Sequence, residues 1–155
     1  MNEAHMRRAV ALSRRGMELG HGGPFGAVVV RDDTVIGEGW NEVLRSNDPT
    51  AHAEIVAIRN ACRKLATYEL TGCEIYASCE PCPMCLGAIY WSRIGRVYFA
   101  VNRHDAAGIE FLDEFIYEEM AKPFEERALP IVHVPCDGAL DVFEDWMHLP
   151  GRVTY

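Results

Sequence analysis

Hydrophobic and polar residues alternate along this chain with the periods that helices and strands impose. Near the start, apolar side chains recur at helical spacing through Met6, Val10 and Met17, which predicts an amphipathic helix over about residues 1–20. Later apolar runs bounded by turn residues predict strands, the first two joined by a tight hairpin at 31–33. The segments with strand character are 25–30, 34–43, 74–78, 96–101 and 131–134.

Helical patterns separate most of these strands. A loop rich in capping residues at 46–50 precedes the second helix, in which Ile55, Ile58, Cys62 and Leu65 fall on one face. The helices expected after the first are 51–65, 83–93, 112–121 and 139–147. Strands that alternate with helices predict a layered α/β domain. The run at 96–101 is almost entirely apolar, so we expect that strand at the centre of the sheet.

Length and composition are those of one globular domain. The chain has 155 residues, of which 49% are hydrophobic and 10% aromatic, enough to bury a core. No run approaches the roughly 20 apolar residues that a membrane span needs, and the charged N-terminus lacks the apolar region of a secretory signal. We therefore expect a single domain over residues 1–155, located in the cytoplasm and without membrane contact.

Charge and cysteine content narrow the choice of ligands. The formal net charge is −8, whereas a protein that grips a nucleic-acid backbone normally carries a basic surface. The balance counts against a polynucleotide substrate and permits a small neutral one. The six cysteines are expected to be reduced in the cytosol, where closely spaced cysteines are more often metal ligands than disulfides.

Two short segments carry the residues typical of metal chemistry. Cys82 and Cys85 are spaced to share one face at the start of a helix, where the helix dipole favours the thiolate that binds zinc. His52, at the start of another helix, supplies a third ligand. Three protein ligands leave the fourth tetrahedral position open, as in catalytic zinc sites that acidify a water. Glu54 would then serve beside that position as a general base and acid.

A C-x-x-C pair alone is ambiguous. It also occurs in redox proteins and in structural zinc sites, but the latter need a second pair of ligands, and no separate C-x-x-C outside 79–85 and no H-x-x-x-H is present. The pattern H-x-E followed by P-C-x-x-C is the mark of zinc nucleobase deaminases, in which the glutamate is not a ligand. Here it occurs as HAE at 52–54 and PCPMC at 81–85. The two halves together predict one catalytic zinc per chain.

The segments TAHAEIVAI (50–58) and SCEPCPMCLGAIYWSRIGRVYFA (78–100) resemble the cytidine deaminase superfamily, in the branch that contains guanine deaminase and tRNA adenosine deaminase. The resemblance implies a three-layer α/β/α sandwich with a mixed five-stranded sheet. The acidic segment from 105 through 113–130 to the end of the chain, together with GGPFGAVVV (22–30), resembles the guanine deaminases. It implies a C-terminal segment, 105–155, that helps to close the active site.

The resemblance also implies roles for individual residues. His52, Cys82 and Cys85 match the zinc ligands of the family and Glu54 its proton shuttle. Asp113 matches a carboxylate that assists proton transfer, although a helix cap explains it equally, and this chain has Leu112 where the family has a second acid. The residues expected to contact the substrate are Asn41, Phe25, Tyr155 and, through its backbone N–H, Ala53.

The implied reaction is hydrolysis of guanine to xanthine and ammonia by a zinc-activated hydroxide. Alternatives that stay open at this point are deamination of adenosine in tRNA or of another aminopurine, an aminopterin or an aminotriazine. A non-catalytic zinc-binding interaction domain would need neither Glu54 nor an open ligand position. The branch also implies a homodimer, with AIYW (88–91) as a candidate interface and C-terminal segments that could be exchanged between subunits.

Overall fold

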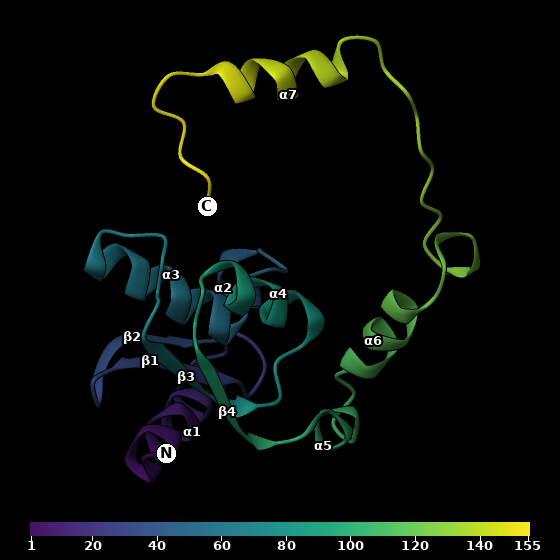
Figure 1. Cartoon of the computed structure of the whole chain (residues 1–155). Helices are drawn as coiled ribbons and strands as arrows, with labels where there is room; N and C mark the ends of the chain where they lie inside the picture. Colours follow the sequence, from purple (N-terminus) through teal and green to yellow (C-terminus); the bar gives the residue numbers. More distant parts are fainter. The chain divides into compact units, whose positions relative to one another are not determined.

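A computed structural model describes residues 1–155, and the chain divides into two compact units, residues 1–117 and 118–155. The first unit is a mixed sheet with helices on both faces (Figure 1). Its strands are β1 (Gly26–Arg31), β2 (Thr34–Trp40), β3 (Cys73–Cys79) and β4 (Arg96–Val101), in the order β2-β1-β3-β4. β1 is antiparallel to β2 and β3, whereas β3 and β4 are parallel. The α/β class is confirmed, with four strands instead of the expected five.

The helix α3 (Ala53–Leu65) packs closely on β2 because both surfaces are built from small residues. Ala53, Ala57 and Ala61 of α3 are fully buried. A side-chain carbon on Gly39 of β2 would lie 2.4 Å from the carbonyl oxygen of Ala53, and one on Gly37 would lie 2.3 Å from that of Ala57. The glycines therefore let the backbone of α3 rest directly on the sheet. This contact sets the position of the N-terminus of α3, where His52 lies.

We expect Gly39→Ala to lower the free energy of unfolding by about 3 kcal/mol, because the new methyl group must push α3 away from β2. Gly87→Ala is a matched control, since Gly87 lies in α4 (Pro83–Trp91) with nothing within 4 Å of an added carbon. The control should be neutral or slightly stabilising. Urea denaturation of both variants checks the prediction, and a G39A midpoint equal to that of the wild type would refute it.

The opposite face of the sheet is covered by α1 (Glu3–Glu18), but of the predicted stripe only Met6 packs against the core. Val10 and Met17 are 44% and 47% exposed, whereas the buried positions of α1 include Ala9, Leu12 and Gly16. A side-chain carbon on Gly26 would lie 2.2 Å from the carbonyl oxygen of Ala9, so the backbone of α1 rests directly on β1 at this point. Leu12 fills the core beside this backbone contact, and a pattern of large apolar residues does not reveal the part formed by small residues.

Two expectations about the sheet are wrong. β4 is an edge strand, and Phe99 and Val101 are 48% and 46% exposed, although its apolar sequence indicated a central position. Residues 131–134 form no strand. They lie between Pro130 and Pro135 in the second unit, and the rings of these prolines leave no backbone N–H for a ladder at either end.

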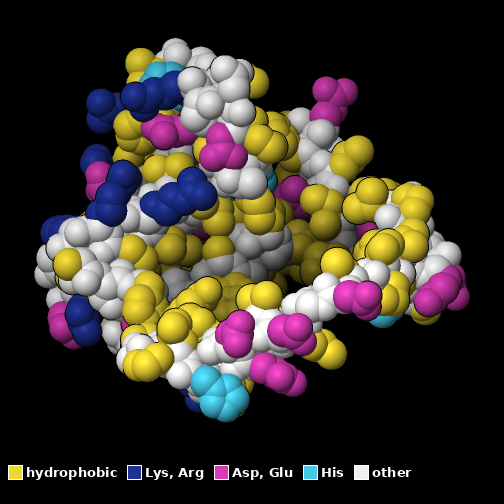
Figure 2. Space-filling model, turned by 90° about the horizontal axis from the view of Figure 1, so that it is seen from above, with side chains coloured by type: hydrophobic (Ala, Val, Ile, Leu, Met, Phe, Trp, Pro, Cys, Tyr) yellow, Lys and Arg dark blue, Asp and Glu magenta, His cyan; other side chains and the backbone are white.

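The remaining helices of the first unit are α2 (Val43–Ser46), α4, α5 (Arg103–Ala107) and the beginning of α6 (Asp113–Ala121). The second unit contains the rest of α6, the 3₁₀ turn η1 (Phe124–Glu126) and α7 (Ala139–His148). It buries no hydrophobic side chain. Many hydrophobic side chains accordingly reach the surface (Figure 2). No helix has the length and apolar character required to cross a membrane.

Candidate active site

Two helices begin at the same place and bring three metal-binding side chains together. His52 is the N-cap residue of α3 and Cys82 that of α4, both with extended backbone, and Cys85 lies in the first turn of α4. The site therefore lies at two helix N-termini, where partial positive charge favours thiolates. Pro83 is accommodated as the first residue of α4 because the missing N–H of proline would have no partner there.

The three donor atoms have the spacing that a tetrahedral ion requires. The Nδ1 atom of His52 lies 3.6 Å from the Sγ atoms of both Cys82 and Cys85, and all three donor atoms lie within 4.8 Å of one another. An ion at typical zinc distances from one nitrogen and one sulfur would separate them by about 3.6 Å at a tetrahedral angle. The donor set of two sulfurs and one imidazole also suits zinc, so the residues fit this metal.

Neighbouring groups lower the pKa of the Cys82 thiol, which favours the thiolate form that binds a cation. The Cys85 thiol, which donates to Cys82, is the largest cause that lowers the pKa of Cys82 to about 4, and the His52 ring acts in the same direction. The Cys82 sulfur in turn raises the pKa of Cys85, with burial as a second cause. Zinc binds cysteine as the thiolate, so metal binding at these two coupled thiols is accompanied by proton release.

Glu54 lies beside this cluster without belonging to it. Its side chain is buried, and the Sγ atom of Cys85 lies 3.4 Å from its Oε2 atom. Burial is the largest cause that raises the pKa of Glu54 to about 7. A carboxyl group with a pKa near neutrality can both take up and release a proton, which is the property of a general acid and base.

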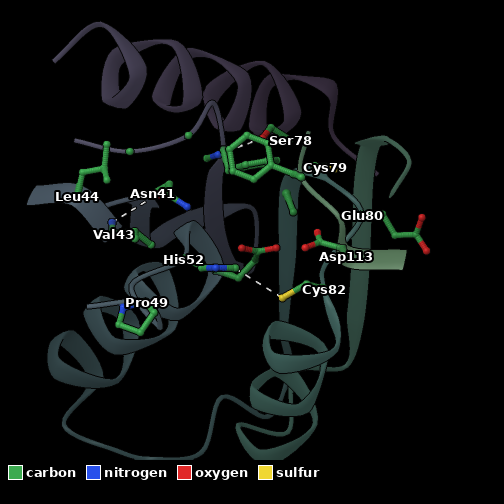
Figure 3. Close-up of a pocket in the computed structure, with 17 residues that line it drawn as sticks. Asn41, Val43, Leu44, Pro49, His52, Ser78, Cys79, Glu80, Cys82 and Asp113 are labelled. Carbon is green, nitrogen blue, oxygen red and sulfur yellow. Dashed lines mark hydrogen bonds between the residues drawn. The ribbon is translucent and has the colours of Figure 1, made fainter. Parts of the chain in front are cut away.

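A cavity of about 270 Å³ opens next to these residues. Figure 3 shows His52, Cys82 and Asp113 on one side of it and Asn41 with Leu44 on another. The other lining residues are Gly22, Gly23, Phe25, Gly26, Val43, Pro49, Glu54, Ala77, Ser78, Cys79, Glu80 and Phe111.

Among the other residues singled out in the sequence, Asn41, Phe25 and Asp113 line this cavity. Asn41 is buried, and its Oδ1 atom accepts a hydrogen bond from the backbone N–H of Val43 at 3.2 Å. The amide nitrogen of Asn41 is directed towards the cavity (Figure 3). The carboxylate of Asp113 is directed inwards as well, and partial burial is the largest cause that raises its pKa.

Ala53 and Tyr155 are placed differently. Ala53 does not line the cavity, because its methyl group is buried in the hydrophobic core. Its backbone N–H, at the first position of the helix, has no intrahelical acceptor. Tyr155 belongs to the second unit and is 68% exposed.

Phe111 is a lining residue that the sequence did not single out. Its ring contacts Phe25 edge-to-face, with centroids 4.8 Å apart. A side-chain carbon on Gly23 would lie 2.6 Å from the Phe111 ring, so the glycine makes room for this aromatic pair. An aromatic residue two positions before Asp113 was the available signal, but nothing local distinguished it from the neighbouring apolar residues.

A family model for the zinc-binding region of cytidine and deoxycytidylate deaminases matches residues 1–101. The chain belongs to the cytidine and deoxycytidylate deaminase family, as the H-x-E and P-C-x-x-C motifs predicted. The His52–Cys82–Cys85 cluster fits the single zinc ion expected in each chain.

Individual relatives make the likeness more specific. The guanine deaminase of Bacillus subtilis is 50% identical over 154 residues, which span 99% of both chains. The crystal structure of guanine deaminase from Bacillus subtilis superimposes with a TM-score of 0.96 at 51% identity, covering 100% of this chain and 99% of that one. The tRNA-specific adenosine deaminase of Haemophilus influenzae is 41% identical over 119 residues, covering 74% of this chain and 68% of that protein.

Proposed function

We propose that this protein hydrolyses guanine to xanthine and ammonia. The likeness to a guanine deaminase spans 99% of this chain and therefore includes its C-terminal third. The likeness to the tRNA deaminase covers only 74% of this chain. The acidic composition agrees with a small neutral substrate, because nothing in a free base requires a basic surface. The observation that carries the proposal is the near-identity in length and fold between this chain and a guanine deaminase.

The cavity supports a free base as the substrate. A volume of about 270 Å³ is small for a ligand site and suits one planar ring system. Phe25 and Phe111 provide an aromatic wall, and the Asn41 side chain provides an amide that can donate and accept hydrogen bonds at a purine edge.

His52, Cys82 and Cys85 would hold zinc at the inner end of this cavity. Zinc supplies a Lewis acid that makes water nucleophilic at neutral pH. Glu54 takes the proton of the attacking water and delivers it to N3 of guanine as the new bond forms at C2. Glu54 then takes the remaining proton from the oxygen now bound to C2 and, assisted by Asp113, delivers it to the amine at C2, so that the C2–N bond breaks, ammonia leaves and the C2 carbonyl of xanthine forms. The backbone N–H of Ala53 orients the substrate near the metal.

Replacing Asn41 with alanine should lower kcat/KM for guanine by about 10- to 100-fold, mainly through KM, because a buried hydrogen-bonding group of the substrate loses its partner. Asn60→Ala is a matched control: Asn60 donates to the carbonyl of Glu38 at 2.7 Å and lies outside the cavity. Steady-state kinetics of both variants check the prediction. An N41A enzyme with the KM of the N60A enzyme would remove Asn41 from substrate recognition.

The second unit supports a proposal about assembly. Its helix α7 exposes Leu140, Val142, Phe143, Trp146 and Met147, and a short helix of this kind needs a surface to pack against. We propose a homodimer in the cytoplasm in which residues 105–155 help to close the active site, with C-terminal segments exchanged and Tyr155 contacting the substrate. Sedimentation equilibrium tests the assembly, and a monomer would exclude the exchange.

Ammonia release by the zinc-loaded protein tests the substrate. The panel comprises guanine, guanosine, adenine, adenosine, cytosine and cytidine, with an aminotriazine, an aminopterin and tRNA added. Release from guanine far above all others supports the proposal. Preferential release from tRNA or from another small amine would keep the zinc site and overturn the assignment of guanine.

A further inference from the structure

The wall of the cavity that carries Asp113 has little hydrophobic core of its own. In residues 103–117, which include α5 and the first turn of α6, only Ala106 is buried. The neighbours of Asp113 on this segment are exposed, Leu112 at 67% and Phe115 at 53%. Few buried side chains hold this segment in place, so the position of Asp113 depends on the contact between Phe111 and Phe25 and on polar contacts.

One set of contacts fastens this segment to the loop that carries Cys82. The hydroxyl of Tyr117 donates to the carbonyl oxygen of Pro81 at 2.8 Å. The guanidinium of Arg103 lies 4.5 Å from the centre of the Tyr117 ring. The backbone N–H of Arg103 donates to the Oε2 atom of Glu80 at 3.0 Å, and its Nη2 atom lies 3.7 Å from Oε1.

Glu80 is thus paired with Arg103 and is distinct from Glu54 and Asp113, the two proposed catalytic carboxylates. Glu80 lines the cavity, but its side chain extends away from that of Asp113, whose carboxylate is directed inwards (Figure 3). Glu80 and Pro81 immediately precede the metal-binding Cys82. Both ends of the 103–117 segment are therefore attached to the two residues that lead into the metal cluster.

Tyr117 stands one helical turn after Asp113 in α6, so the two side chains share a face of the helix. Because the Tyr117 hydroxyl is hydrogen-bonded to Pro81, the first turn of α6 is held at a set orientation and distance from Cys82. We propose that Tyr117 is a positioning residue, supported by Arg103, that holds the carboxylate of Asp113 at the cavity. This inference rests on the proposed role of Asp113 in guanine deamination.

The test compares Tyr117→Phe, Asp113→Asn and the double variant with a control, Tyr98→Phe, which removes a hydroxyl that donates to the Oε1 atom of Glu74 at 3.4 Å, outside the cavity. Y117F removes one hydrogen bond and keeps the ring under Arg103. We expect kcat to fall by about five- to tenfold, the amount that one hydrogen bond supports. KM and the zinc content should stay at wild-type values. The double variant should be no slower than D113N, because Tyr117 acts through Asp113.

Hydrogen exchange supplies a readout that does not depend on turnover. Amides of residues 103–117 should exchange faster in Y117F than in the wild type, and Y98F should leave them unchanged. Equal exchange in Y117F and the wild type overturns the inference, as does a loss of kcat that adds fully to that of D113N. A D113N protein with wild-type kcat would instead refute the role of Asp113, and an inactive wild type would refute the proposed function itself.

Discussion

Glu54→Gln should lower the turnover of guanine by about a thousandfold or more, because glutamine keeps the shape of the side chain but cannot carry a proton between water and substrate. Glu54 is buried and lies 3.4 Å from Cys85, outside the group of three metal-binding donors. The variant should therefore retain one zinc per chain and a similar KM. Steady-state kinetics together with metal analysis check both parts of this expectation.

Glu69→Gln provides the control, because Glu69 is a surface carboxylate paired with Arg93 at 3.0 Å and does not line the cavity. Its turnover should equal that of the wild type. A nearly active E54Q enzyme would show that another group transfers the proton. An E54Q protein without zinc would leave the loss of turnover explained by the metal, so Glu54 would then act as a ligand.

Cys82→Ala should reduce zinc from one ion per chain to nearly none and abolish guanine turnover. The change removes the donor with the lowest pKa in the cluster, about 4, and leaves one nitrogen and one thiol. The stability of the folded C82A protein should also no longer depend on the metal. A ligand at 1,000 times its dissociation constant stabilises the folded state by about 4 kcal/mol, so a chelator should lower the Tm of the wild type and leave that of C82A unchanged.

Cys136→Ala controls for the loss of a cysteine as such, because Cys136 is exposed in the second unit and donates only to the neighbouring carbonyl of Asp137. C136A should bind zinc and turn over guanine like the wild type. Full zinc occupancy in C82A would contradict the assigned ligand set. Activity of C82A without zinc would contradict the metal-dependent chemistry.

Local spacing made the metal cluster predictable from the sequence. His52 and Glu54 stand at the start of α3, and Cys82 and Cys85 at the start of α4, so short sequence spacing brings the members of each pair close together. Only the contact between the starts of α3 and α4 joins residues that are distant in sequence. The motif allowed this contact to be predicted, because the function that it marks requires all four residues at one site.

The contribution of residues 103–117 to the site could not be predicted in the same way. Phe111 lines the cavity and Tyr117 contacts the loop before Cys82 because the 103–117 segment folds back towards Phe25 and Pro81, which are far away in sequence. Neither residue belongs to a local pattern that indicates a ligand. Their roles depend on contacts that appear only once the chain has folded.

Errors about the fold had two physical sources. The apolar run of β4 indicated burial, but hydrophobicity does not distinguish a central strand from an edge strand whose outer face stays uncovered in this chain. In α1 the large residues Val10 and Met17 suggested the wrong face, because the sheet is approached through Ala9 and Gly16 instead. Backbone contact between small residues leaves little trace in a hydrophobic pattern.

Simultaneous measurement of xanthine and ammonia formed from guanine tests the central claim most directly. The protein is loaded with one zinc per chain, and the metal-free protein serves as the blank. Equal amounts of xanthine and ammonia, formed only by the zinc-loaded protein, are the predicted result. Absence of xanthine while zinc is fully bound would contradict the account.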